Sequence, residues 1–464
     1  MISSNRLPIF VALFYFILGL FFVFNFEGTG DQGDSILHYL YAKYAPSHLE
    51  LYFDHWAKPF YVLVASPFAQ FGFNGIKIFN LICISLTIYF TIKSALLLSL
   101  KNSWFAGIVI GFSPLVMVLT FSGLTEPLFA FLLILGFYFL MQQRLIVSTI
   151  FFSFLPFVRS EGLIIVGVIG LFLLIKKHWK ILPWLALGHV LYAFAGFFVH
   201  GNLFWVIEKI PYSTLSSVYG DGGLFHYVVQ LNYVIGVPIY ILFGLGIICL
   251  IYSFFKDKTV TYLHLIFVTF AAFFVAHSLF WYLGIFNSMG LKRVLIAVIP
   301  LIGIIALLGI NFLLTFLKKQ ELISNIVLGA VFMVVLIFPF LSNPASINWE
   351  RDMKLTADQH LIHQARSFIE DEGLLSRRFF HAHPYVSESF SIDHFDLTRR
   401  VELTTGYPKY IKPGDVIVWD SWFAVVERQV TKELLDTDTR LEKLIALEKV
   451  VNNQNVSILL YRVK

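Results

Sequence analysis

The sequence predicts a mainly α-helical, polytopic membrane protein with a small α/β domain at its C-terminal end. The 464 residues are 58% hydrophobic and only 14% charged, and their mean hydropathy is +0.77. Soluble domains are typically about 45–50% apolar and about 25% charged. Long apolar runs recur from residue 8 to residue 342, and charged residues become frequent only after them. We therefore expect a transmembrane region over residues 1–343 and a soluble domain over residues 344–464.

The apolar runs have the length that membrane-spanning helices require. A span needs about 20 apolar residues, and the runs indicate about eleven spans. The first run lacks an Ala-x-Ala cleavage pattern, so we interpret it as a retained span and not as a secretory signal. Short runs flank Arg159–Gly162, so this junction is expected below the membrane surface, in a protein-lined cavity. The expected spans are 8–26, 75–99, 103–122, 127–142, 145–158, 162–175, 181–199, 229–255, 259–283, 293–316 and 322–342.

The basic residues of the short loops indicate which side faces the cytoplasm, because cytoplasmic loops are enriched in Lys and Arg. If the spans alternate, the N-terminus and one set of basic loops share the cytoplasmic side. The other side receives the C-terminal domain and a long first loop over residues 27–74, in which we expect helices along the membrane surface. The cytoplasmic set comprises Arg6, Lys101, Arg144, Lys176, Lys177, Lys180, Lys256, Lys258, Lys318 and Lys319.

The C-terminal region has the mixed pattern of an α/β domain. Segments Phe379–Val386, Asp415–Trp419 and Val456–Val463 are expected to be strands, and helical stretches lie between them. His381 and His383 alternate on the first of these strands, but no third ligand accompanies them, so we assign no metal site there. The chain's two cysteines lie in apolar runs, which argues against a disulfide framework. The small net charge of +5, with no basic stripe, argues against a nucleic-acid partner.

Two carboxylates stand directly after the first expected span. Asp31 and Asp34 are three residues apart and would share one face if this stretch is helical. Apolar neighbours could raise the pKa of one of them and make it a usable general base. His38 and Tyr39 follow in the same segment. The spacing alone leaves a second interpretation equally open, namely a helix cap and a solvated loop charge.

A second polar cluster lies later in the same loop. Asp54, His55 and Lys58 fall within five positions of one another, beside Trp56 and Tyr61. Lys58 could hold a phosphate as a point charge, and the aromatic rings could stack on a sugar. The competing interpretation is a lysine that snorkels towards the membrane surface beside a tryptophan of the aromatic belt.

Further ionisable residues interrupt the apolar runs. Glu126 precedes a proline, Arg159 and Glu161 flank a break, and Arg293 opens a late run. Ionisable groups at membrane depth are costly, so they mark candidate functional sites and are usually paired. Arg293 could bind a phosphodiester through both arms of its guanidinium. A structural ion pair of Arg159 with Glu126 or Glu161, and a snorkelling Arg293, are the alternatives.

Taken in order, these motifs resemble those of the GT-C class of glycosyltransferases, which includes protein O-mannosyltransferases and the lipid A aminoarabinose transferase. Members are multi-span proteins whose long first outer loop carries a catalytic acidic motif. The family's acid is followed four positions on by Tyr, whereas Asp34 is followed by His38 and then Tyr39, so the choice between Asp31 and Asp34 stays open. The lysine motif here lacks one proline of the family's Lys-Pro-Pro-Leu-Tyr. The matching segments are Gly33–Tyr39, Lys58–Tyr61, Thr125–Pro127, Arg159–Gly162 and Arg293 with Pro300, within about residues 8–316.

The resemblance implies an inverting transferase that moves a monosaccharide from a polyprenyl-phosphate carrier to a hydroxyl of a glycan, lipid or protein. It implies a hexosyl- or pentosyltransferase, mannosyltransferase-like, in the inner membrane of a bacterium. Asp34 or Asp31 would be the catalytic base, and Lys58, Arg293 and Arg159 would bind the donor phosphate. Supporting roles fall to His38, Tyr39, Asp54, His55, Glu126 and Glu161. The sequence specifies no cofactor and leaves a divalent metal ion open.

A transporter or flippase of a lipid-linked saccharide is the alternative function. Such a protein would carry polar residues along its helices near the midplane and repeated broken spans. This chain instead gathers its acidic residues towards one expected face of the membrane, which favours the transferase.

Overall fold

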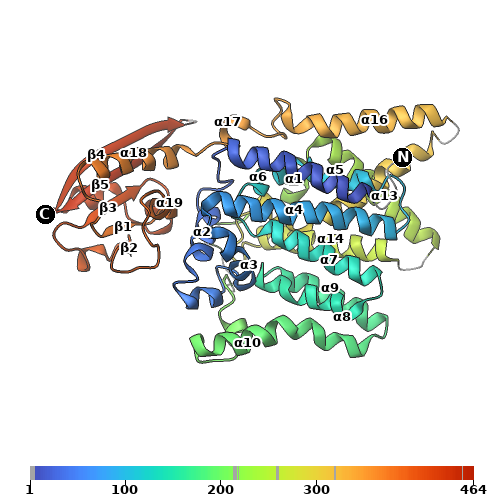
Figure 1. The fold of residues 1–464 in the computed structure, drawn as a ribbon, viewed down its shortest axis with the longest axis horizontal. Coiled ribbons are helices and arrows are strands. Elements are labelled where there is room, and N and C mark those ends of the chain that lie inside the picture. Colours follow the sequence, from blue (N-terminus) through green and yellow to red (C-terminus); the bar gives the residue numbers. More distant parts are fainter. Residues whose placement is uncertain (1–5, 213–216, 218, 258–260, 318–319, 452) are drawn as a thin grey trace.

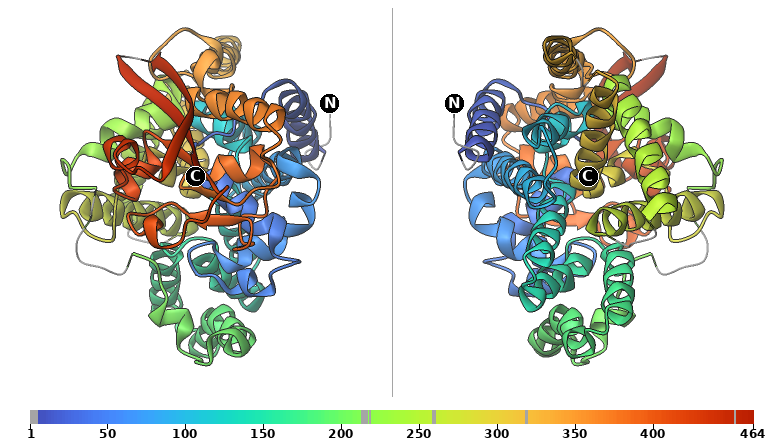
Figure 2. Two further views of the ribbon diagram at one scale, coloured as in Figure 1. Left: turned by 90° about the vertical axis from the view of Figure 1, so that its left-hand side faces the viewer. Right: turned by 90° about the vertical axis from the view of Figure 1, so that its right-hand side faces the viewer.

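The computed structural model describes residues 6–464 apart from 213–216, 218, 258–260, 318–319 and 452. The helices form an elongated bundle, and an α/β domain sits at one end of it (Figure 1). The C-terminus lies in that domain, whereas α1 begins towards the opposite end of the bundle. Figure 2 views the molecule from these two ends. The predicted architecture of a helical region followed by a small mixed domain is confirmed.

Seven helical segments of the described chain are long and apolar enough to cross a membrane. Two of them lie at the centre of the bundle, since 72% of the apolar window in α4 and 94% of that in Lys292–Thr315 is buried. The outer segments α1 and α16 expose apolar side chains such as Phe14 and Phe24, as lipid-facing helices do. The seven are α1 (Leu7–Asn25), α4 (Gly72–Leu97), Trp179–His200 including α10 (Leu187–His200), α13 (Val237–Asp257), α14 (Tyr262–Tyr282), Lys292–Thr315 including α15 (Ile299–Thr315), and Glu321–Phe340 including α16 (Glu321–Ile337).

The other expected spans are shorter or broken. The run 103–122 forms two helices, α5 (Trp104–Gly111) and α6 (Pro114–Thr120), because Pro114 begins a new helix. The run 229–255 is divided at Gly236, whose φ of +77° ends α12 (His226–Ile235) before α13 begins. Three more are short apolar helices: α7 (Glu126–Met141), α8 (Leu145–Phe154) and α9 (Gly162–Ile175). The count of about eleven spans therefore stays a prediction. Lys258, Lys318 and Lys319 of the basic loops lie outside the described residues.

The long first loop folds into short helices, and their placement along the membrane surface stays a prediction. It contains α2 (Asp34–Tyr44), a 3₁₀ turn over Leu49–Phe53, and α3 (Pro59–Ala69), which packs against α2. Helix α2 also contacts α19 (Pro384–Ser389) of the C-terminal domain. The loop is thus held between the bundle and that domain.

The C-terminal domain is built on a five-stranded mixed sheet in the order β2-β1-β3-β5-β4. Strand β1 is parallel to β2 and β3, whereas β5 is antiparallel to β3 and β4. The strands are β1 (Phe379–His381), β2 (Arg400–Glu402), β3 (Val416–Asp420), β4 (Leu441–Val451) and β5 (Gln454–Val463). Its helices are α17 (Trp349–Asp352), α18 (Ala357–Asp371), α19 and α20 (Lys432–Asp436), with a π-helical turn over Phe423–Glu427.

Two expectations for this domain need correction. The strand expected over Phe379–Val386 ends at His381, because Pro384 begins α19 instead of continuing the strand. His381 and His383 therefore do not alternate along one strand. Strand β4 was not expected, since it lies at the sheet edge and its first residues, Leu-Glu-Lys-Leu, show no strict alternation of apolar and polar side chains.

Candidate active site

The first part of the site is the turn that joins α1 to α2. Gly30 has a φ of +72°, and a Cβ there would lie 2.6 Å from the Cβ of Ser122, so this glycine lets the turn approach the segment before α7. The backbone N–H of Gly33 donates to Asp31 Oδ1 over 2.8 Å, and that of Ser35 does so over 3.4 Å. Asp31 thus lies in the turn while Asp34 is the first residue of α2, so the condition of one continuous helix, under which they would share a face, is not met.

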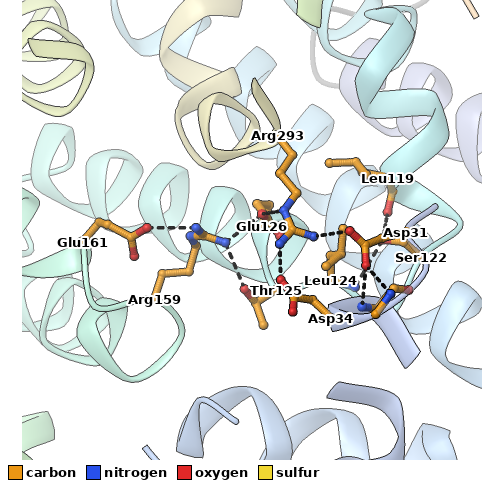
Figure 3. Close-up of polar contacts among 12 residues, drawn as sticks. Asp31, Asp34, Leu119, Ser122, Leu124, Thr125, Glu126, Arg159, Glu161 and Arg293 are labelled. Atoms are coloured by element: carbon orange, nitrogen blue, oxygen red, sulfur yellow. Dashed lines mark hydrogen bonds and ion pairs between the residues drawn. The ribbon is translucent and has the colours of Figure 1, made fainter. Parts of the chain in front are cut away.

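Arg293 joins both carboxylates. It lies in a 3₁₀ turn over Lys292–Val298, immediately before α15. Its Nη1 is 2.8 Å from Asp31 Oδ2, and its Nη2 donates to Asp34 Oδ2. Its Nε is 3.7 Å from Glu126 Oε1. The predicted phosphate ligand and the two predicted bases therefore form one ion-paired group (Figure 3).

Arg159 extends this group towards α9. Its Nη1 lies 2.7 Å from Glu126 Oε1 and its Nη2 lies 2.9 Å from Glu161 Oε1. Glu126, at the start of α7, is fully buried between the two arginines. The result is a continuous chain of charges from the α1–α2 turn to the start of α9, as Figure 3 shows. The structural pairing that we weighed for Arg159 is present, and both candidate carboxylates take part in it.

Lys58 has a different environment from the arginines. Its backbone is left-handed, with a φ of +69°, which is uncommon for a residue with a side chain and often marks a functional position. Its Nζ donates to Ser160 Oγ over 3.3 Å, and the ion pairs of the described residues do not include it. Burial lowers the pKa of Lys58 to about 8, although Glu161 opposes that shift. Lys58 is therefore the cation in this group that is least committed to a carboxylate.

The electrostatics around Asp34 keep it ionised. Burial alone would raise the pKa of Asp34, but the guanidinium of Arg293 holds it below its ordinary value. His38 stacks on Trp56 with ring centroids 5.0 Å apart. Burial also lowers the pKa of His38 to about 3, against the opposing effect of Asp34, so the imidazole is neutral near pH 7.

Three of the residues predicted to support the site point elsewhere. The Tyr39 hydroxyl donates to Glu388 of α19 over 3.1 Å. Asp54 accepts the N–H of Ala57 over 3.0 Å, which shapes the turn before Lys58. His55 contacts the Val206 carbonyl over 3.0 Å and packs on Trp205, away from the carboxylates. These three side chains shape the surroundings of the site.

Several residues of the site were not predicted. Thr125 Oγ1 lies 3.4 Å from Arg159 Nη1, and Ser160 Oγ accepts a hydrogen bond from Lys58 Nζ. Tyr61, considered as a sugar platform, instead donates to the Gly123 carbonyl over 2.6 Å and is fully buried. His277 Nε2 is 3.9 Å from Glu161 Oε1, an approach between distant helices that sequence spacing does not reveal. Thr125 and Ser160 adjoin the ionisable motifs, so proximity in sequence could have found them.

The described residues show no group of three or more His, Cys, Asp or Glu side chains arranged to hold a metal ion. A cavity of about 390 Å³ adjoins the α1–α2 turn, and its lining does not include Asp31, Asp34 or Arg293. Its lining includes Thr29 and Ile36 from this segment, Lys77 from α4, and Tyr385 and Glu388 from α19. The turn therefore adjoins both the charged group and a cavity that the bundle and the C-terminal domain share.

Comparison with known proteins bears on the fold. No family model matches the sequence, and no curated protein does. ArnT from Cupriavidus metallidurans, solved bound to undecaprenyl phosphate, is similar over 98% of this chain and 97% of its own, with a TM-score of 0.59 and 12% identity. Its apo state gives a TM-score of 0.54 at the same identity and coverage. The chain therefore has the overall fold of ArnT. Together with the seven apolar helices, this fold identifies an integral membrane protein.

Proposed function

We propose that the protein is an inverting glycosyltransferase that takes a monosaccharide from a polyprenyl-phosphate carrier and transfers it to a hydroxyl acceptor. The observation that carries this proposal is the convergence of Asp31, Asp34, Arg159 and Arg293, with Lys58 nearby, at one end of a GT-C bundle. The likeness to ArnT, which was solved with undecaprenyl phosphate, supports a donor of that kind.

In the proposed reaction the acceptor oxygen attacks the anomeric carbon, and the bond from that carbon to the phosphate oxygen breaks. The acceptor proton passes to a carboxylate, and the carrier leaves as polyprenyl phosphate. We assign the base to Asp34, because its side chain is ionised and more exposed than that of Asp31 (44% against 28%), whereas Asp31 is tied to the backbone of its own turn. Its low pKa makes it a weak base, and loss of its bond to Arg293 when phosphate binds would strengthen it.

The donor phosphate is assigned to the cations of the group. Lys58 supplies an ammonium without a carboxylate partner among the described residues, so it can bind phosphate without breaking an ion pair. Arg293 and Arg159 stabilise charge on the departing phosphate while Glu126 keeps them in place. The donor's polyprenyl chain would lie in the bilayer beside the bundle, which explains why the reaction is carried out by a membrane protein.

The proposed orientation places this site outside the cytoplasm. Asp34 begins α2, which lies at the end of the bundle that carries the C-terminal domain and contacts α19 (Figure 1). With the N-terminus in the cytoplasm of a bacterial cell, residues 1–343 form the catalytic membrane region and residues 344–464 lie on the outer side. Nucleotide sugars are absent from that side, so a lipid-borne donor fits the position.

A vesicle experiment separates a transferase from a flippase. Purified protein is placed in liposomes with polyprenyl-phosphate sugars that are radiolabelled in the sugar, and a panel of glycan, lipid and peptide acceptors is added. The proposal predicts transfer of label to one acceptor class without vesicle-wide redistribution of the donor. Redistribution of the donor without transfer to any acceptor would reject the transferase. Analysis of the glycans and carrier lipids that accumulate in cells lacking the protein then identifies the sugar and acceptor.

A further inference from the structure

We propose that Gln359 of the C-terminal domain is a positioning residue for Asp31, and that it acts through Thr29. This inference rests on the proposed function for its catalytic consequence, and on geometry for the contact itself. Gln359 lies in the first turn of α18, far from Asp31 in the sequence, and its side chain is fully buried. It would make the soluble domain a working part of the active site.

The contact is a short chain of hydrogen bonds. Gln359 Nε2 donates to Thr29 Oγ1 over 3.0 Å, and Thr29 Oγ1 donates to the Asp31 carbonyl over 2.8 Å. The hydroxyl of Thr29 therefore both accepts and donates, and it fixes the backbone of the residue whose carboxylate meets Arg293. Thr29 is only 4% exposed, so little water competes for these bonds.

The amide of Gln359 is itself held in place. Its Oε1 accepts the backbone N–H of Thr356 over 3.0 Å, which forms one half of the capping box at the start of α18. With the oxygen fixed in this way, the Nε2 group is directed at Thr29. A leucine at this position would keep much of the volume but would lose both bonds.

Thr29 is also tied to the bundle from the opposite direction. Its carbonyl accepts the Ser35 hydroxyl over 2.6 Å, and Ser35 Oγ in turn accepts the N–H of Gly123 over 2.7 Å. The neighbouring Gly28 N–H donates to the Met353 carbonyl over 2.9 Å. The α1–α2 turn is therefore held by hydrogen bonds to the segment before α7 and to the C-terminal domain.

The cavity beside the turn gives these bonds their importance. Thr29 and Ile36 line the cavity of about 390 Å³ described above, so packed side chains do not fill the space on that side of the turn. Without Gln359 the turn could shift towards the cavity, and the Asp31 carboxylate would move relative to Arg293 and Asp34. A misplacement of about 1 Å in an active site can cost on the order of 100-fold in rate.

The test compares two glutamines of the same helix. Gln359→Leu removes the contact, and Gln364→Leu alters an exposed glutamine one turn later as the matched control. We expect kcat to fall by about tenfold to 100-fold in Gln359→Leu, with the KM for the polyprenyl donor within about twofold, because Lys58 is untouched. Thr29→Val should behave like Gln359→Leu, and Thr29→Ser should restore most of the activity. Unchanged kcat in Gln359→Leu, or equal losses in Gln364→Leu and Gln359→Leu, would overturn the proposal.

Amide hydrogen exchange provides a readout that does not need activity. The N–H groups of Gly33 and Ser35 donate to Asp31, so peptides covering residues 27–36 should exchange faster in Gln359→Leu and Thr29→Val than in wild type or Gln364→Leu. Equal exchange in all four proteins would overturn the positioning role even if activity had fallen. If wild type transfers no sugar but the exchange differs as expected, the positioning contact stands and the proposed function fails.

Discussion

The bundle and the C-terminal domain both bury polar side chains, but they satisfy them differently. In the domain, His381 Nδ1 meets the His383 carbonyl, its Nε2 meets Ser387, and Ser387 also meets His394. His383 pairs with Asp358 over 2.9 Å through Nε2 and accepts the Tyr385 N–H at Nδ1. Each ring nitrogen of His381 and His383 thus has a hydrogen-bond partner, which is the pattern of a structural network.

In the bundle, the charged groups are paired but not fully hydrogen-bonded. Glu126 is in ion-pair contact with Arg159 and lies close to Arg293, yet neither of its carboxylate oxygens receives a well-directed hydrogen bond. The Nε atoms of Arg159 and Arg293 are likewise buried without a hydrogen-bond acceptor among the described residues. Buried charges that keep bonding capacity are costly unless a ligand uses it. Arg399 and Arg400 of the domain also have buried, unpaired Nε atoms, so the feature that distinguishes the bundle is Glu126, a fully buried carboxylate with no directed hydrogen bond to either oxygen in the described part of the chain. This difference supports our proposal that the bundle carries the ligand chemistry and that the histidine network of the domain is structural.

The largest effect is expected from Asp34→Asn. The amide keeps the size of the side chain but cannot accept the acceptor's proton, so transfer should fall by at least about 100-fold. Purified protein in a radiolabel transfer assay gives the rate, and Glu50→Gln in the same outer loop serves as the exposed control. Wild-type turnover in folded Asp34→Asn would show that Asp34 is not the base.

The next largest effect is expected from Lys58→Met. Loss of a charge-assisted bond to phosphate should raise the donor KM by about tenfold or more. The exposed Lys409→Met is the control for removal of one positive charge. If Lys58→Met changed the donor KM no more than Lys409→Met does, Lys58 would be a structural lysine and its assignment to the donor phosphate would be wrong.

The pH dependence of donor affinity sharpens the assignment of Lys58. Its folded pKa of about 8 lies below the ordinary lysine value, and the charged form is the one that binds phosphate. Donor affinity should therefore be constant below about pH 7 and should fall as the pH rises through about 8. In Lys58→Arg this alkaline decline should disappear below pH 10, since arginine stays charged. The steady-state KM for the donor, measured between pH 6 and 10 in wild type and in Lys58→Arg, tests this prediction. An unchanged alkaline decline in Lys58→Arg would mean that another group causes the decline.

The smallest effect on transfer is expected from a change in the domain's own network. Ser387→Ala leaves His381 Nε2 and His394 Nδ1 with one partner fewer, which should cost about 1–3 kcal/mol of domain stability. The midpoint temperature of thermal unfolding should fall. The kcat, measured well below that midpoint, should stay within about twofold of the wild-type value. A loss of transfer as large as that expected for Gln359→Leu would show that this network of the domain also affects catalysis, against the structural role assigned to it.

Much of the fold could be predicted from the sequence, because the length of an apolar run and the charge of a loop are properties of one continuous segment and do not depend on tertiary contacts. The segments around α1, α4, α14 and α15 were expected within a few residues of their bounds. Gly236 and Pro114 divide runs that hydropathy alone joins, and β4 lacks the burial that produces a regular strand pattern. Pairing of distant edges, such as β5 with both β3 and β4, depends on tertiary contacts.

The candidate site was predictable in its members but only partly in its connections. Carboxylates and arginines within or beside apolar runs are costly to bury, so they can be recognised as candidate site residues from the sequence alone. The residues named in this way are Asp31, Asp34, Glu126, Arg159 and Arg293. The pairing of Arg159 with Glu126 and Glu161 could be named as well, but the pairing of Arg293 with Asp31 and Asp34 could not, since more than 250 residues of chain separate them. The role of Gln359 was equally hidden, because a buried glutamine in a helix cap carries no sequence signature of a distant partner.

The most direct test of the account is a titration of purified protein with undecaprenyl phosphate, with the phosphate-free polyprenol as the comparison ligand. We predict saturable binding of the phosphate, weaker binding of the polyprenol, retention of phosphate binding in Asp34→Asn, and a loss of about tenfold or more in Lys58→Met. Equal binding of the two lipids, or undiminished phosphate binding in Lys58→Met, would contradict the assignment of the charged group as the donor site.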